Sequence, residues 1–137
     1  MNINKAIIAG VAATAVMSLV AMFVAPMMGM PKMDFGTMLG TNNPMMAMPY
    51  AAGWMIHFVL GIIMAIVYAK FLFGKLPGNG ILQGIIYGLI LFVLAQVLVV
   101  PMMGNGVFSG GNMQMIMGSL IGHIVFGAVL GAVYSKA

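Results

Sequence analysis

Four apolar segments, each of about 20 residues, account for most of this chain. They cover residues 4–25, 50–73, 78–100 and 113–134. A helix of this length spans the hydrocarbon core of a bilayer, and a mean hydropathy of +1.17 with only 4% charged residues lies outside the range of soluble domains. We therefore predict an all-α fold, an integral membrane four-helix bundle that forms a single domain over residues 1–137.

The sequence also repeats itself. The first and third segments end in the same four residues, Pro-Met-Met-Gly, at 26–29 and 101–104. The second and fourth share the pattern His-x3-Gly-x6-Tyr-x-Lys, which starts at His57 and at His123. Because each unit crosses the membrane twice, the two units should be related by a pseudo-two-fold axis along the membrane normal. The tandem two-helix repeats predicted in this way span residues 1–74 and 75–137.

The lysines predict how the chain is oriented. Lys5, Lys70, Lys75 and Lys136 all fall on one side of the four segments, and Lys32 alone falls on the other. Positive residues collect on the cytoplasmic side of membrane proteins, so we expect both termini to be cytoplasmic in a bacterial inner membrane. The net charge of +4 comes from these few lysines, and they are too sparse to indicate nucleic-acid binding.

The two histidines are the strongest candidates for a functional site. His57 and His123 lie within apolar segments, where an unpaired polar group costs several kcal/mol and generally has a partner or a task. Ser18, Thr14 and Gln96 could be hydrogen-bond partners, and proton transfer is a further alternative. The histidines, with Gln96, could instead hold haem b or a pigment, although the chain has no arginine to pair with haem propionates.

Methionine is unusually frequent, at 18 residues, and is concentrated in the outer loops. Thioethers are suitable ligands for Cu(I), so Met17, Met22 and Met117 near the histidines are candidate copper ligands. Methionine also packs irregular apolar interfaces and adaptable binding surfaces. Both interpretations remain open at this point.

Glycines and aromatic residues indicate packing. Small residues four positions apart favour close helix approach. The glycines expected at helix interfaces are Gly61, Gly84, Gly88, Gly118, Gly122, Gly127 and Gly131. Tyr68 and Tyr134 are expected to be anchors at the membrane surface. The apolar first outer loop, residues 26–49, should fold over the bundle or against a partner.

The chain resembles a family of small four-span bacterial membrane proteins of unknown function. The resemblance covers nearly the whole chain and includes Pro-Met-Met-Gly-Met-Pro, Gly53-Trp54-x2-His57-Phe58, Ala95-Gln96-x4-Pro-Met-Met-Gly and Gly118-Ser119-Leu120-x-Gly122-His123. It implies a bacterial inner-membrane protein with four helices, and it implies no activity.

Two functional hypotheses follow. The chain has no Cys, Arg or Glu and a single Asp, so no nucleophile or carboxylate is positioned by sequence to work with the histidines, and we do not expect an enzyme. The first hypothesis is a non-catalytic accessory subunit that contacts lipid and the other subunits of a larger membrane complex, plausibly a respiratory or electron-transfer complex. The alternative is a membrane protein that binds haem, a pigment or copper through His57 and His123.

Overall fold

The computed structural model describes residues 1–136 and contains four helices long and apolar enough to cross a membrane. These helices run Ile3–Met27, Tyr50–Leu72, Gly80–Met102 and Met113–Lys136. No strand occurs among the described residues. The all-α prediction is confirmed, and the predicted bounds lie within two residues of the observed ones at every helix end.

Local changes of helix type divide these four helices into shorter elements. The first comprises α1 (Ile3–Leu19), η1 (Val20–Val24) and α2 (Ala25–Met27), and the second α3 (Tyr50–Val67) and η3 (Tyr68–Leu72). The third comprises α4 (Gly80–Leu94), η4 (Ala95–Val99) and α5 (Val100–Met102), and the fourth is α6 (Met113–Lys136). Two short helical turns, η2 (Thr37–Thr41) and η5 (Val107–Gly111), lie in the connections.

The first and third helices end in the same way. Each widens into a π-helical turn, η1 or η4, just before its proline, because Pro26 and Pro101 have no N–H to donate and their rings displace the carbonyl four residues earlier. Gly29 (φ 85°) and Gly104 (φ 88°) then adopt the left-handed conformation that ends a helix without steric cost. The N–H of the following residue donates to the carbonyl of Ala25 or Val100, at 3.1 Å in both helices.

Three of the four helices begin at an asparagine. The Oδ1 atoms of Asn2, Asn79 and Asn112 accept from the backbone N–H three residues later, at 3.1, 3.0 and 3.2 Å. An asparagine cap satisfies an N–H that has no partner inside the helix. The second long helix instead begins after Pro49, whose φ of -58° is already close to the helical value.

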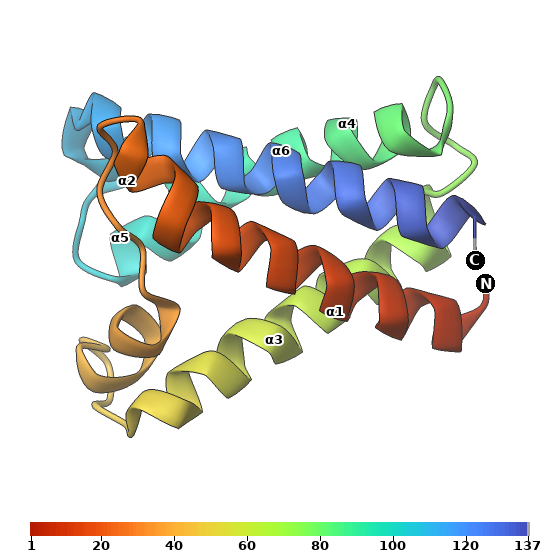
Figure 1. The fold of residues 1–137 in the computed structure, drawn as a ribbon. Helices are drawn as coiled ribbons and strands as arrows, with labels where there is room; N and C mark the ends of the chain where they lie inside the picture. Colours follow the sequence, from red (N-terminus) through yellow and green to blue (C-terminus); the bar gives the residue numbers. More distant parts are fainter. Residues whose placement is uncertain (137) are drawn as a thin grey trace.

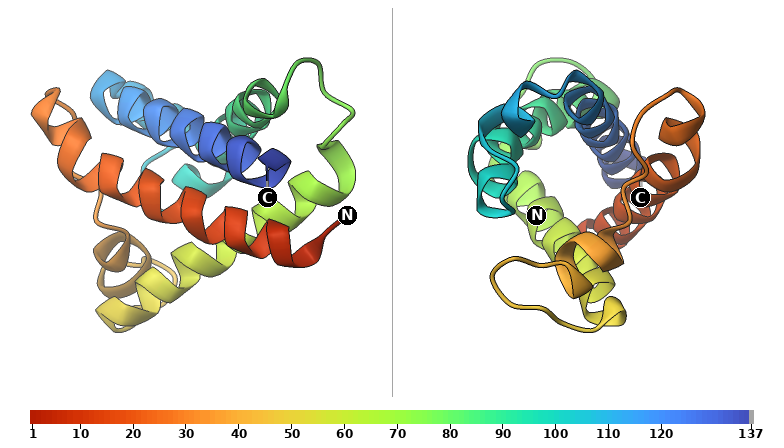
Figure 2. Two further views of the ribbon diagram at one scale, coloured as in Figure 1. Left: turned by 45° about the vertical axis from the view of Figure 1, so that its right-hand side comes forward. Right: turned by 90° about the vertical axis from the view of Figure 1, so that its left-hand side faces the viewer.

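The four helices are arranged so that α1 packs on both α3 and α6, and α6 packs on α4 (Figure 1). In contrast, α3 diverges from α4 along the molecule, as Figure 1 and the left-hand view of Figure 2 show. The start of α1, the end of α6 and the connection at residues 73–79 lie at one end, which we call the terminal end. The connections at residues 28–49 and 103–112 lie at the opposite end, which we call the loop end.

The contact between α4 and α6 is a contact between backbones. A Cβ atom at Gly84 would collide with the carbonyl oxygen of Gly127, and one at Gly127 with the carbonyl oxygen of Gly84. Gly88 and Gly131 face the carbonyls of His123 and Gly80 in the same way. Because lipid tails are as apolar as the helices themselves, close packing of this kind holds membrane helices together.

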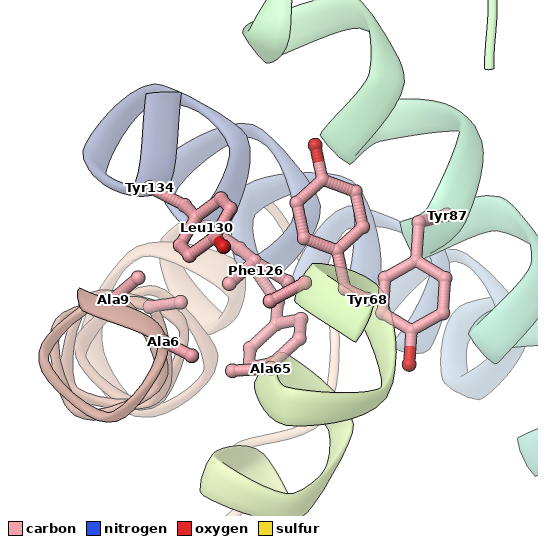
Figure 3. Close-up of a cluster of buried hydrophobic side chains, with 10 residues drawn as sticks. Ala6, Ala9, Ala65, Tyr68, Tyr87, Phe126, Leu130 and Tyr134 are labelled. Atoms are coloured by element: carbon pink, nitrogen blue, oxygen red, sulfur yellow. The ribbon is translucent and has the colours of Figure 1, made fainter. Parts of the chain in front are cut away.

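At the terminal end the core is aromatic. Tyr68, Tyr87 and Tyr134 are buried with Leu130 and Phe126 against the alanines of α1 (Figure 3). The Tyr87 hydroxyl donates to the carbonyl of Met64 at 2.9 Å and so connects α4 to α3. Tyr68 is 0% exposed and Tyr134 6%, so both side chains fill the space between helices and do not face outward as surface anchors would.

Candidate functional site

A cavity of about 360 Å³ lies between the helices in the half of the molecule nearer the loop end. It forms where α3 diverges from α4, and its walls come from all four long helices and both long connections. Its lining is mostly apolar, with six methionines among the lining residues. The residues that carry polar chemistry include His57, His123 and Gln96, so the structure brings these three predicted site residues to one cavity.

The His57 side chain is held in one orientation by contacts on two sides. Its Nε2 lies 3.1 Å from the hydroxyl of Ser18, and that hydroxyl donates its single proton to the carbonyl of Thr14 at 2.6 Å. His57 is therefore the donor to Ser18. The ring of Phe35 stacks on the imidazole at 3.8 Å between centroids, and Nδ1 makes no hydrogen bond with the described residues.

His123 is held by its own helix. Its Nδ1 lies 2.7 Å from the carbonyl oxygen of Ser119, which can only accept, so Nδ1 carries the proton. Because the proton is on Nδ1, Nε2 is left with a free lone pair. The predicted bond across a helix interface occurs at His57, whereas at His123 the partner is one turn earlier in α6. Each imidazole thus presents one unbonded nitrogen, in the manner of histidines that bind a ligand or metal.

Gln96 is fully buried, at 0% exposed. Its Oε1 accepts from the hydroxyl of Ser109 at 3.0 Å, whereas its Nε2 has no partner among the described residues. An amide donor left without a partner in an apolar environment costs about 1–3 kcal/mol. Gln96 lines the cavity, and its Nε2 is the one buried side-chain N or O atom without a hydrogen-bond partner among the described residues.

The turn that brings Ser109 over Gln96 is strained. Phe108 (φ 48°) and Ser109 (φ 55°) adopt left-handed conformations, followed by Gly110 and Gly111, also with positive φ. For residues with a side chain this conformation costs roughly 1–2 kcal/mol each. The fold keeps this strained turn, which places Ser109 in the cavity wall with its hydroxyl bonded to Gln96. Strain of this kind often marks a functional segment.

The first outer loop covers the cavity at the loop end. Met33, Phe35 and Met38 from this loop form part of the wall. The loop packs directly against the backbone of α3. A Cβ atom at Gly53 would collide with backbone atoms of Gly36 and Gly40, so only glycine allows this close contact. The expectation that residues 26–49 fold over the bundle is in accord with this arrangement.

The other predicted site residues are placed differently. Met17 lines the cavity, but Met22 and Met117 do not, so the candidate copper ligands are not gathered at one point. No cluster of three or more His, Cys, Asp or Glu side chains with metal-binding geometry occurs within residues 1–136. The predicted packing glycines fall into two groups. Three line the cavity: Gly61, which also lies against Thr14, Gly118 and Gly122. The other four lie in the α4–α6 contact: Gly84, Gly88, Gly127 and Gly131.

Sequence reasoning missed two site residues, Phe35 and Ser109. Phe35 stacks on His57 from 22 positions earlier in the chain, in a loop without any periodic pattern. The signal available for Ser109 was its place between Gly106 and the Gly110-Gly111 pair, which allows an irregular turn.

Comparison with curated proteins and with solved structures gives no match. A family described as "Family of unknown function (DUF6789)" matches residues 1–137. The expected resemblance to a family of unknown function over the length of the chain is confirmed to that extent. The chain therefore belongs to this family of unknown function, DUF6789.

Proposed function

We propose that this protein binds a small, largely apolar molecule inside the membrane, without catalysing a reaction. The cavity of about 360 Å³ lies within the range of about 300–1,000 Å³ typical of ligand sites, and such sites combine an apolar wall with a few placed polar groups. His57, His123 and Gln96 would be those polar contacts.

The observation that carries this proposal is the unpartnered amide of Gln96. Buried polar groups in proteins are almost always hydrogen-bonded, so an exception needs an explanation. A ligand that accepts a hydrogen bond from Nε2 supplies the missing partner. The free nitrogens of His57 and His123 in the wall of the same cavity offer two further contacts.

The size of the cavity favours one ring over a tetrapyrrole. An engineered cavity of about 150 Å³ holds benzene, so about 360 Å³ suits a substituted ring. Haem or a chlorophyll-type pigment, with four linked rings, would require α3 and α4 to move apart. We therefore place haem and pigment below a single-ring compound among the candidate ligands.

We further propose that the protein is a multi-pass protein of a bacterial inner membrane, built from two tandem repeats with both termini cytoplasmic. The helix ends and the connection at the terminal end contain Lys5, Lys70, Lys75 and Lys136, and the positive-inside rule assigns such an end to the cytoplasm. The matching endings of the first and third helices, with the same hydrogen bond from Met30 to Ala25 and from Asn105 to Val100, support the repeats.

This orientation can be tested with single cysteines, because the chain has none of its own. Asn42→Cys lies in the first outer loop and Asn79→Cys lies in the connection at the terminal end, and both positions are exposed. In intact bacterial cells a membrane-impermeant maleimide should label Asn42→Cys, and should label Asn79→Cys only after the cells are opened. The reverse labelling pattern would invert the proposed orientation.

Binding can be tested by purifying the protein in mild detergent and identifying co-purifying small molecules by mass spectrometry, together with metal analysis and an absorption spectrum. We expect near-stoichiometric ligand on the wild type. The His57→Leu/His123→Leu double variant should lose about tenfold or more of the bound ligand, because two polar contacts are removed. Gln114→Leu, an exposed change on α6, is the matched control and should keep its ligand.

The binding test also has an outcome that contradicts the proposal. A folded, isolated wild-type chain that carries neither a small molecule nor a metal would reject ligand binding. If the wild type instead carries stoichiometric copper and the double histidine variant loses it, the cavity is a metal site and not a site for an apolar ligand.

A second candidate function is that of a non-catalytic accessory subunit of a respiratory or electron-transfer complex. The observation that favours it is a group of exposed methionines at the loop end, which includes Met27 (86% exposed), Met28, Met45 and Met46. Exposed apolar patches near the membrane surface suit contact with another membrane protein. Recovery of the chain only with a stable partner, and without ligand once the partner is removed, would select this function.

A further inference from the structure

We infer that the cavity recognises an aromatic diol of the membrane-quinol class, and prefers it to the corresponding quinone. This inference rests on the proposed function and names the ligand class of the same cavity. The pattern of free donors and acceptors in the cavity wall is what distinguishes a quinol from a quinone.

The histidines offer two acceptors. The Nε2–H of His57 is used by Ser18, and the Nδ1–H of His123 by the Ser119 carbonyl. Each imidazole therefore has one lone pair that can accept a hydrogen bond, so a ligand with two donors could use both. A quinol has two hydroxyl donors, whereas a quinone has only carbonyl oxygens, which would face these lone pairs without a hydrogen bond.

Gln96 offers the complementary donor. The bond from the Ser109 hydroxyl at 3.0 Å holds Oε1, so the amide cannot turn its Nε2 away without losing that bond. A quinol hydroxyl can accept from Nε2 while it donates its own proton to an imidazole nitrogen. One diol could in this way satisfy the buried amide and both histidines, all of which line the cavity.

The rest of the wall suits an aromatic ring. Met17, Met64 and Met115 line the cavity with Phe35 and Phe126. Thioether sulfur makes favourable contacts with aromatic rings, and ring edges pack well against other aromatic faces. The divergence of α3 from α4 also leaves a side of the cavity where an alkyl tail could extend toward lipid.

Two other ligand classes fit less well. A simple aliphatic alcohol has one hydroxyl and would leave one imidazole without a donor. A soft metal ion could use both imidazole nitrogens, but the N–H of Gln96 would then face a cation, which such a donor does not bind. The amide therefore favours an uncharged hydroxyl ligand over a metal.

The test compares three compounds with the same ring and the same decyl tail: a benzoquinol, its benzoquinone, and the dimethyl ether of the quinol. Wild-type protein in lipid nanodiscs is equilibrated with each compound without oxygen, and bound compound is quantified by mass spectrometry. We expect the quinol to bind about tenfold more tightly than either of the others, because only the quinol donates hydrogen bonds. The dimethyl ether controls for ring volume.

Variants then assign the contacts. Gln96→Leu and His57→Leu should each reduce the preference for the quinol, whereas the exposed control Gln114→Leu should preserve it. Equal affinity for all three compounds would overturn the inference and leave apolar ligand binding in place. The same holds if the protein binds none of the three compounds but co-purifies with a different small molecule. No binding of any compound, with no co-purified ligand, would overturn both the inference and the proposed function.

Discussion

Gly127→Ala is expected to destabilise the protein by about 3 kcal/mol, although alanine favours helix more than glycine does. A Cβ atom at this position would collide with the carbonyl oxygen of Gly84, and it would also lie 2.8 Å from the carbonyl carbon of Gly84 and 3.1 Å from the Cα of Gly88. All of these obstacles are backbone atoms, so no side chain can move aside. The α4–α6 contact would have to separate, and it is the most extensive contact between helices in the fold. The measurement is the free energy of unfolding in detergent micelles.

The matched control is Gly118→Ala in the same helix. The nearest neighbour of its Cβ atom would be the terminal methyl of the flexible Met33 side chain, at 3.3 Å, which can shift slightly, and Met30 would be in ordinary contact at 3.8 Å. We expect no loss of stability there, and a gain of up to about 1 kcal/mol from helix propensity. Equal stability changes at the two positions would contradict the backbone contact between α4 and α6.

The Gln96→Leu/Ser109→Gly double variant is expected to gain about 2–3 kcal/mol of stability while it loses ligand binding by roughly tenfold. Leucine removes the unpartnered amide of Gln96 and keeps most of the side-chain volume. Glycine relieves the left-handed strain at Ser109 and removes a hydroxyl that would otherwise lose its acceptor. A protein that is more stable and binds less well would identify this pair as a functional site.

The two single variants complete the comparison. Gln96→Leu alone leaves the Ser109 hydroxyl without its acceptor, and Ser109→Gly alone leaves both polar ends of the amide without partners. The single changes should therefore be less favourable than the double change, with a coupling of about 1 kcal/mol between them. Thermal unfolding of all four proteins measures this coupling. A double variant less stable than the wild type, with ligand binding retained, would make the Gln96–Ser109 contact purely structural.

Local features of the sequence predicted much of the fold. The lengths of the apolar segments predicted the four helices, and the Pro-Met-Met-Gly endings marked where two of them stop. Proline and glycine act on the backbone within one helical turn, so Pro26 and Gly29 have the same effect in any tertiary context.

The candidate site was predictable only in part. His57, His123 and Gln96 stood out because each is a polar residue in an apolar segment, and all three line one cavity. Met22 and Met117, which were also predicted as ligands, do not line it. The stacking of Phe35 on His57 was not predictable, since a loop residue gives no periodic signal of where its ring packs.

The sequence by itself determined that this chain forms four long apolar helices, where they begin and end, and which polar residues lie within them. These properties depend on hydropathy and on hydrogen bonds between residues no more than five positions apart. Only the tertiary structure decided that Tyr68 is buried, that His123 bonds to its own helix, and that α3 diverges from α4 to leave a cavity. The physical reason is that these features depend on which helix faces lie opposite each other, and close contacts such as Gly84 with Gly127 set that arrangement between segments distant in sequence.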